Sequence, residues 1–213
     1  MDGMRPIEQT REAVLGSYDA DACDLLATLL GYAGVKGERD ALAHSLLDGY
    51  GSIERILNQK YKELLKNDGM KEHCAVLLSS IFPILSRSHT DALQKTPLGK
   101  EADAGRFFVC KYLGIKEERA YMLLLDSDGM YIDCSEISIG DVSTAAIYHG
   151  KIVERIIDSG AHYVAIAHNH PFGTSTPSSS DREVSYILSD ICQKMRVTFM
   201  GHFVVGSNTY SMA

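Results

Sequence analysis

The chain has 213 residues, 45% of them hydrophobic, which suits one globular domain or two small ones. Its formal net charge of −7 argues against strong non-specific binding to DNA, because such binding needs a basic surface that displaces counterions. No apolar run reaches the length of about 18 residues that a membrane-spanning helix requires, so the sequence predicts no such helix.

Cysteine usage and the first residues bear on the cellular compartment. The five cysteines are odd in number and scattered, and none forms a Cys-x-x-Cys pair. Small, buried apolar side chains in a reducing compartment are the simplest interpretation. Residues 1–9 lack the apolar core of a secretory signal. Together these features predict a cytoplasmic protein.

The first 90 residues predict only helices. Leucine and isoleucine recur there at helical spacing, and glycines separate the periodic runs. The predicted helices cover residues 21–32, 40–50, 53–57, 61–65 and 71–85. We therefore expect a small all-helical domain over residues 1–90.

The rest of the chain predicts alternating helices and strands. Residues 86–99 are polar and contain Pro97 and Gly99, so we expect an inter-domain linker there, placed at 91–99, and a second domain at 100–213. Mixed strands flanked by helices predict an α/β sandwich for that domain. Its predicted elements are a helix at 100–113, strands at 119–125 and 130–139, a helix at 144–159, a strand at 162–167, a helix at 179–195, and strands at 197–205 and 209–212.

Two histidines and an aspartate carry the clearest chemical signal. His168 and His170 end a predicted strand that Pro171 terminates, and side chains at i and i+2 of a strand point to the same side. Asp181 lies in the first turn of the helix that follows Ser178. Two imidazoles and one carboxylate with an open coordination position are the layout of a catalytic zinc site rather than a structural one.

Each of these residues also has an ordinary interpretation. Ser178 and Asp181 fit a capping box, which would still fix the helix that presents Asp181. Asp181 alone suits the positive end of a helix dipole. His202, on the predicted strand 197–205, is more typical of a core residue or of a residue behind the ligands, so we leave it out of the ligand set.

The spacing of these residues resembles the JAMM (MPN+) motif of metallopeptidases. The pattern is His168-x-His170-Pro171, six residues, Ser178, two residues and Asp181, and its local sequence is similar to the bacterial RadC family. The resemblance implies a mixed-sheet MPN/JAMM (cytidine-deaminase-like) sandwich after a small all-helical domain. It also implies that the two histidines and the aspartate bind Zn²⁺, that the serine helps to hold the polarised intermediate, and that an upstream glutamate acts as acid and base.

Glu136 is the residue that we assign to the glutamate of this family. It lies in a predicted strand four residues before Gly140, where RadC-like sequences often carry Glu-Leu-Phe-x-Gly. The chain departs from the family at Asp141, usually Thr, and at residues 148–151. An ordinary outward-facing strand residue is the alternative interpretation of Glu136.

The helical half resembles the N-terminal helix-hairpin-helix-type domain of RadC proteins. In that hairpin two glycines normally bring backbone N–H groups close to a phosphate. Here Gly69 is kept and Lys71 replaces the second glycine, with Asp68 and Glu72 on either side. The sequence therefore favours a degenerate hairpin with a structural role, and Gly69 and Lys71 are weak candidates for nucleic-acid contact.

Taken with the resemblance, the residues predict a zinc-dependent hydrolase of JAMM type that cleaves an amide bond in a protein or peptide substrate. The alternative is a non-catalytic, DNA-associated module of the RadC DNA repair and recombination family. A third possibility is a scaffold that keeps zinc only for stability. The sequence leaves the substrate and the oligomeric state open.

Overall fold

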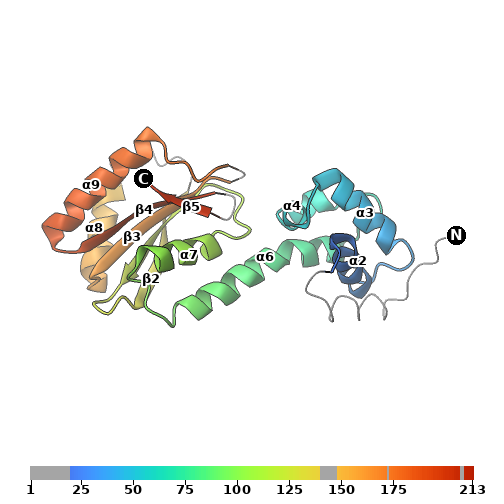
Figure 1. The fold of residues 1–213 in the computed structure, drawn as a ribbon, viewed down its shortest axis with the longest axis horizontal. Coiled ribbons are helices and arrows are strands. Elements are labelled where there is room, and N and C mark those ends of the chain that lie inside the picture. The colour runs from blue at the N-terminus through green and yellow to red at the C-terminus, as the bar shows by residue number, and fades with distance from the viewer. Residues whose placement is uncertain (1–19, 140–147, 172, 207–208) are drawn as a thin grey trace. The chain divides into compact units, whose positions relative to one another are not determined.

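The computed structural model describes residues 20–139, 148–171, 173–206 and 209–213, and the chain divides into two compact units at residues 84 and 85 (Figure 1). Each unit has its own hydrophobic core. Among the residues that the structure describes, no helix is both long and apolar enough to span a membrane.

The first unit consists of helices, as the periodicity predicts. Asp21 caps the helix that begins at Ala22 by accepting a hydrogen bond from the Cys23 N–H, and Ser52 caps the helix that begins at Ile53 in the same way. The helices are α2 (Ala22–Tyr32), α3 (Arg39–Tyr50), α4 (Ile53–Leu57), α5 (Tyr61–Leu64) and the start of α6 (Glu72–Leu93). Their apolar faces bury one core, which includes Leu26, Leu30, Leu46, Ile56, Leu64 and Leu78.

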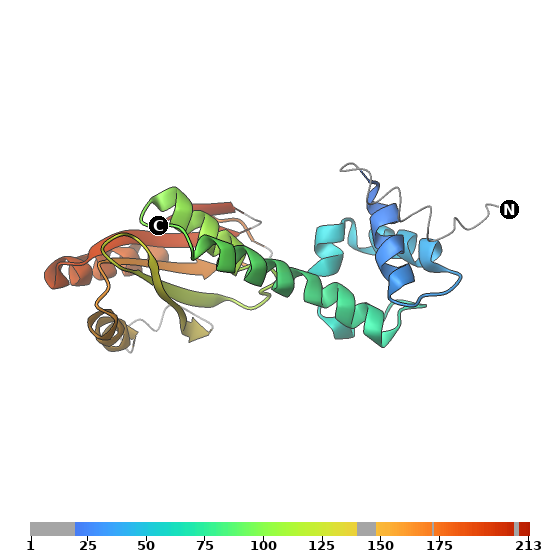
Figure 2. The ribbon, with the colours of Figure 1, turned by 90° about the horizontal axis from the view of Figure 1, so that it is seen from below.

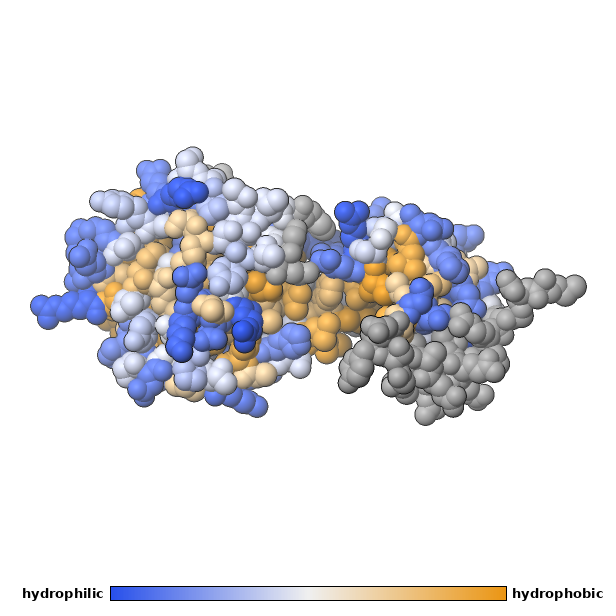
Figure 3. All heavy atoms as spheres, viewed as in Figure 1, coloured by the Kyte–Doolittle hydropathy of each residue, from blue (hydrophilic) through white to orange (hydrophobic). Residues whose placement is uncertain are grey.

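Helix α6 is longer than the sequence predicts, and it includes the first part of the predicted linker. The helix continues through Pro83 to Leu93, so residues 86–93 are helical. Pro83 removes its own N–H from the hydrogen-bond ladder without ending the helix. The hydroxyl group of the buried Thr90 donates to the Ser86 carbonyl group within the same helix, so this polar residue is compatible with helix. Exposed apolar side chains lie along α6 (Figure 3), at Val76, Leu77, Ile84 and Leu85.

The second unit contains a mixed five-stranded sheet. Its strands are β1 (Arg119–Leu125), β2 (Tyr131–Ile139), β3 (Tyr163–Asn169), β4 (Thr198–Gly206) and β5 (Thr209–Met212). The order is β2-β1-β3-β4-β5, with β3 and β4 parallel and the other pairs antiparallel. The predicted hairpin between β1 and β2 is confirmed, and Gly129 adopts a positive φ of 77° in its turn.

Helices cover both faces of this sheet. Helix α7 (Glu101–Lys111) packs on one face, whereas α8 (Tyr148–Ser159) and α9 (Ser179–Met195) pack on the other (Figures 1 and 2). Of the helix predicted at 144–159, residues 144–147 lie outside the described residues. The predicted mixed α/β fold after N-terminal helices is therefore confirmed.

The alternation of β3 decides where its last residues point. Ala165 and Ala167 belong to the core under α7, whereas Val164 and Ile166 belong to the core under α8 and α9. Successive strand residues point to opposite faces, so His168 follows Ile166 on the α9 face.

Candidate metal centre

At the end of β3, the side chains of the two histidines and the side chain of Asn169 point to opposite sides of the strand. His168 is 1% exposed and lies opposite Ala120 of β1 and Val204 of β4. The Asn169 side chain turns the other way, where its Oδ1 accepts from the Arg119 N–H at 2.9 Å and its amide donates to the Glu117 carbonyl at 3.1 Å. Asn169 thus fixes the strand so that His168 and His170 project on one side, as predicted.

Helix α9 presents Asp181 to these histidines. The Ser178 N–H donates to Asp181 Oδ2 at 2.7 Å, and the Asp181 N–H donates to Ser178 Oγ at 3.2 Å, so the predicted capping box is present. The Ser178 hydroxyl group also donates to Oδ2 at 2.7 Å. With Oδ2 held in this way, the other carboxylate oxygen, Oδ1, faces His168.

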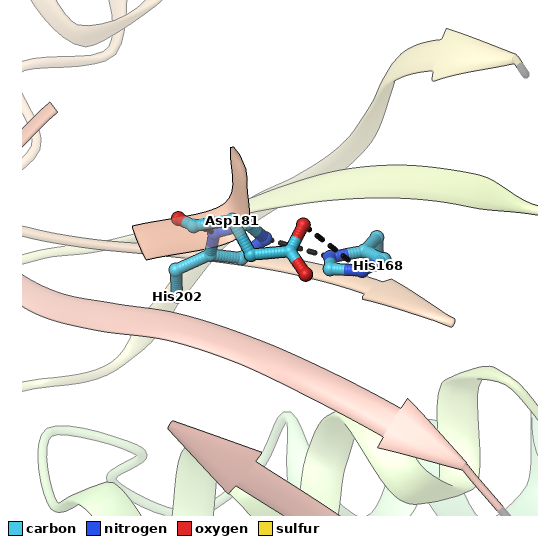
Figure 4. A group of neighbouring side chains, drawn as sticks. All are labelled: His168, Asp181 and His202. Atoms are coloured by element: carbon cyan, nitrogen blue, oxygen red, sulfur yellow. Dashed lines mark hydrogen bonds and ion pairs between the residues drawn. The ribbon is translucent and has the colours of Figure 1, made fainter. Parts of the chain in front are cut away.

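A compact polar cluster results, part of which is drawn in Figure 4. His168 Nε2 lies 3.5 Å from Asp181 Oδ1 and 3.0 Å from His170 Nε2, while His168 Nδ1 lies 2.7 Å from His202 Nε2. His168, Asp181 and His202 are all buried and form a group that could bind a metal ion.

Hydrogen-bond partners assign the protons on the three imidazoles. A carbonyl oxygen can only accept, so the 3.3 Å contact of His202 Nδ1 with the Asp181 carbonyl places a proton on that nitrogen. His202 Nε2 then accepts from His168 Nδ1. By the same argument His170 carries its proton on Nδ1, which donates to the Thr174 carbonyl at 2.9 Å. His168 Nε2 therefore carries no proton, and it faces Nε2 of His170.

Burial keeps His168 and His202 neutral at neutral pH. Loss of solvent, together with the neighbouring His202 and His170, lowers the pKa of His168 to about 4 against the attraction of Asp181. Burial likewise lowers the pKa of His202. Burial acts to raise the pKa of Asp181, but hydrogen bonds from Ser178 and the nearby histidines outweigh it, so that pKa lies below its usual value. The cluster thus combines an ionised Asp181 carboxylate with the neutral imidazoles of His168 and His202.

Glu136 lies in a different environment. It pairs with Tyr121 across β1 and β2, and its Oε2 accepts from the Arg119 guanidinium at 3.0 Å and from the Tyr121 hydroxyl at 3.4 Å. Tyr121 belongs to the core on the α7 face. Within the described part of the chain, no hydrogen bond or ion pair joins Glu136 to His168, His170 or Asp181. The structure therefore brings four of the five predicted active-site residues together and leaves Glu136 apart.

Two further assignments made from the sequence concern His202 and the turn at Gly69 and Lys71 in the helical unit. His202, which the sequence analysis left out of the ligand set, is buried against His168. This contact depends on the pairing of β3 with β4, in which His202 lies opposite Ile166, and the sequence alone does not reveal that register.

Gly69 adopts a positive φ of 76° in the turn before α6, and Lys71 donates to the Gly34 carbonyl at 3.4 Å. The contact of Gly69 and Lys71 with nucleic acid stays a prediction.

Comparisons with known proteins cover this region and the helices before it. Residues 98–213 match the model of the RadC-like JAB domain. A UPF0758 protein of Burkholderia thailandensis is 28% identical over 212 residues, which cover 98% of this chain and 80% of that protein. A UPF0758 protein of Shewanella piezotolerans is 29% identical over 206 residues, which cover 93% and 90%. With its mixed sheet and buried His-Asp-His group, the chain belongs to the family of RadC-like JAB domain proteins.

Proposed function

We propose that His168, His170 and Asp181 bind a zinc ion and that the protein is a zinc-dependent hydrolase of amide bonds. One observation carries this proposal: His168 Nε2 lies 3.0 Å from His170 Nε2 and 3.5 Å from Asp181 Oδ1, so a second imidazole and a carboxylate both lie beside this one nitrogen. A cation bound at His168 Nε2 would draw on the lone pairs of these neighbours and would be stabilised by the negative charge of Asp181.

The distances between these atoms support a zinc ion in particular. Zinc–ligand bonds of roughly 2.0–2.1 Å in a tetrahedral site separate neighbouring ligand atoms by about 3.3 Å. The Nε2 atoms of His168 and His170 are 3.0 Å apart, and His168 Nε2 is 3.5 Å from Asp181 Oδ1. Two imidazoles and one carboxylate are also a donor set that suits zinc. Three protein ligands leave a coordination position open for catalysis.

The residues of this site divide the work of hydrolysis. A zinc ion, if bound by these residues, would supply a Lewis acid that lowers the pKa of a water molecule and polarises a carbonyl group. Ser178 orients Asp181 as a ligand, because its hydroxyl group donates a hydrogen bond to Asp181 Oδ2. To donate to the developing oxyanion of a substrate, that hydroxyl group must rotate away from Oδ2 while the two backbone hydrogen bonds of the capping box persist.

We propose that Glu136 takes a proton from water and passes it to the leaving amine, provided that its side chain moves. Its Oε1 has no hydrogen-bond partner within the described residues, so one carboxylate oxygen is available to accept a proton. A general base must come within hydrogen-bond reach of the proton that it takes. Glu136 therefore has to release Arg119 and Tyr121 and move toward the α9 face when substrate binds.

The test uses zinc-loaded protein with two substrate sets, linear peptides and peptides joined through a lysine ε-amide. We expect cleavage of an amide bond in at least one set, read by mass spectrometry as two products whose summed mass exceeds that of the substrate by one water. The double variant His168→Ala/His170→Ala is the control and should give none. If the wild type carries zinc and still matches the double variant on both sets, the hydrolase proposal is wrong.

A further inference from the structure

We propose that His202 is a positioning residue, which fixes the tautomer of His168 so that its Nε2 lone pair faces His170 and Asp181. The proposal rests on the metal site proposed above, and it assigns His202 a place behind that site. Within the buried group of His168, Asp181 and His202, the first two residues would bind the metal ion, and His202 would orient the ring of His168.

The first step is the direction of the hydrogen bonds. The Asp181 carbonyl can only accept, so His202 Nδ1 donates to it, at 3.3 Å. A neutral imidazole then has one acceptor left, and His202 Nε2 accepts the proton of His168 Nδ1 at 2.7 Å. Since a neutral imidazole carries a single N–H, this bond leaves Nε2 of His168 unprotonated.

The second step is the side of the His168 ring on which each neighbour lies. His202 contacts Nδ1, whereas Asp181 Oδ1 and His170 contact Nε2. A cation bound at Nε2 of His168 therefore lies across the ring from His202. Metal-binding histidines commonly donate their second N–H to a fixed acceptor, and loss of that acceptor typically lowers metal affinity about 10–100-fold.

The third step is how His202 is held. It lies on β4, opposite Ile166 of β3, and is 1% exposed. One ring thus bonds to His168 on β3 and to the backbone of α9 at Asp181. Because these two elements carry two of the proposed ligands, His202 also fixes the distance between them.

The tautomers can be read directly in metal-free wild-type protein, by long-range ¹H–¹⁵N NMR of the histidine rings. We expect the Nδ1–H form for both His168 and His202. In His202→Leu the Nε2–H form of His168 should appear, because its acceptor is gone. If His168 carries its proton on Nε2 in the wild type, the proposal is overturned whatever the metal content.

Affinity for Zn²⁺ alone, measured by competition with a chelating dye, gives the second readout. We expect His202→Leu to bind zinc 10–100-fold more weakly, and His202→Gln, which keeps an oxygen acceptor near the Nε2 position, to recover most of the loss. Ser185→Ala is the matched control, since Ser185 Oγ donates to the same Asp181 carbonyl at 2.9 Å and no hydrogen bond joins it to His168 within the described part of the chain. It should bind zinc as the wild type does.

The outcomes distinguish this proposal from the metal site on which it rests. Loss of zinc stoichiometry in His202→Leu with full retention in His170→Ala would make His202 a ligand and overturn its positioning role. Zinc affinity within twofold of wild type in a folded His202→Leu variant would overturn it too. If wild-type protein binds no zinc, the metal proposal fails, while the NMR result still decides the tautomer of His168.

Discussion

The carboxylates on the two faces of the sheet have different neighbours. On the α7 face, Glu136 accepts hydrogen bonds from Arg119 and Tyr121, so the protein itself supplies the neutralising cation. On the α9 face, Asp181 has Ser178 at one oxygen and the unprotonated side of His168 at the other. The first carboxylate therefore has a cation of the protein beside it, whereas for the second we propose a metal ion.

Neighbouring residues of β1 place the proposed metal site and the Glu136 ion pair on opposite faces of the sheet. Ala120 lies between His168 and Ser138, whereas the next residue, Tyr121, lies between Ala167 and Glu136. A single step along β1 therefore separates the row of His168 from the row of Glu136. Changes on the α9 face should alter metal binding, and changes on the α7 face should leave it intact.

The largest effect is expected from Asp181→Asn. The amide lacks the negative charge that offsets a divalent cation, so zinc affinity should fall at least 100-fold, as measured by dye competition. Asp190→Asn is the matched control, because Asp190 lies exposed on the same helix and pairs with Lys194. Equal zinc affinity in the two variants would remove Asp181 from the ligand set.

The stability of the metal-free protein should depend on pH because His168, on the α9 face, titrates differently in the folded and unfolded states. The pKa of His168 in the folded protein is about 4, below its unfolded value of 6.5, so the unfolded chain binds more protons between these values. Stability is therefore full above pH 6.5 and falls as the pH approaches 4. The loss is at most on the order of 3 kcal/mol for a shift of this size.

Denaturant unfolding of chelator-treated protein between pH 7 and 4 measures that loss. The variant His168→Gln should show a flatter profile across the window, because the titrating ring is gone. A wild-type midpoint that stays constant down to pH 4 would contradict the neutral, buried state of His168.

The cap on α9 should have a smaller effect on folding. Ser178→Ala removes the acceptor for the Asp181 N–H and one donor to Oδ2, so the free energy of unfolding should fall by about 1 kcal/mol. Zinc affinity should fall in the same variant, because Asp181 loses part of its support. Ser179→Ala changes the adjacent exposed residue and should match the wild type in both measurements. A Ser178→Ala variant that also matched would contradict the role of the cap.

The smallest effect on metal binding is expected from Glu136→Gln. Zinc content should stay at the wild-type value, since Glu136 contacts Arg119 and Tyr121 on the other face. The partly exposed Arg119–Glu136 pair is worth less than about 1 kcal/mol, so the melting temperature should change little. Amide hydrolysis, by contrast, should be lost if Glu136 is the base. Loss of zinc in this variant would break the separation between the two faces.

Local chemistry allowed much of the fold and most of the site to be predicted from sequence. The Asp-Gly turn after β1, the proline after β3 and the Ser178 cap are each decided within a few residues. The extent of α6 was not predicted, because its polar second half follows a proline. The contacts of His202 and Glu136 depend on strand register, with a shift between Ala120 and Tyr121, which no local pattern specifies.

The most direct test of the account is the zinc content of purified protein, measured by elemental analysis for the wild type and for His168→Ala/His170→Ala. The account predicts about one zinc per wild-type chain and none in a folded double variant. A wild type that binds no zinc even after refilling with Zn²⁺, or a double variant that keeps it, would contradict the proposal that these histidines form a metal site.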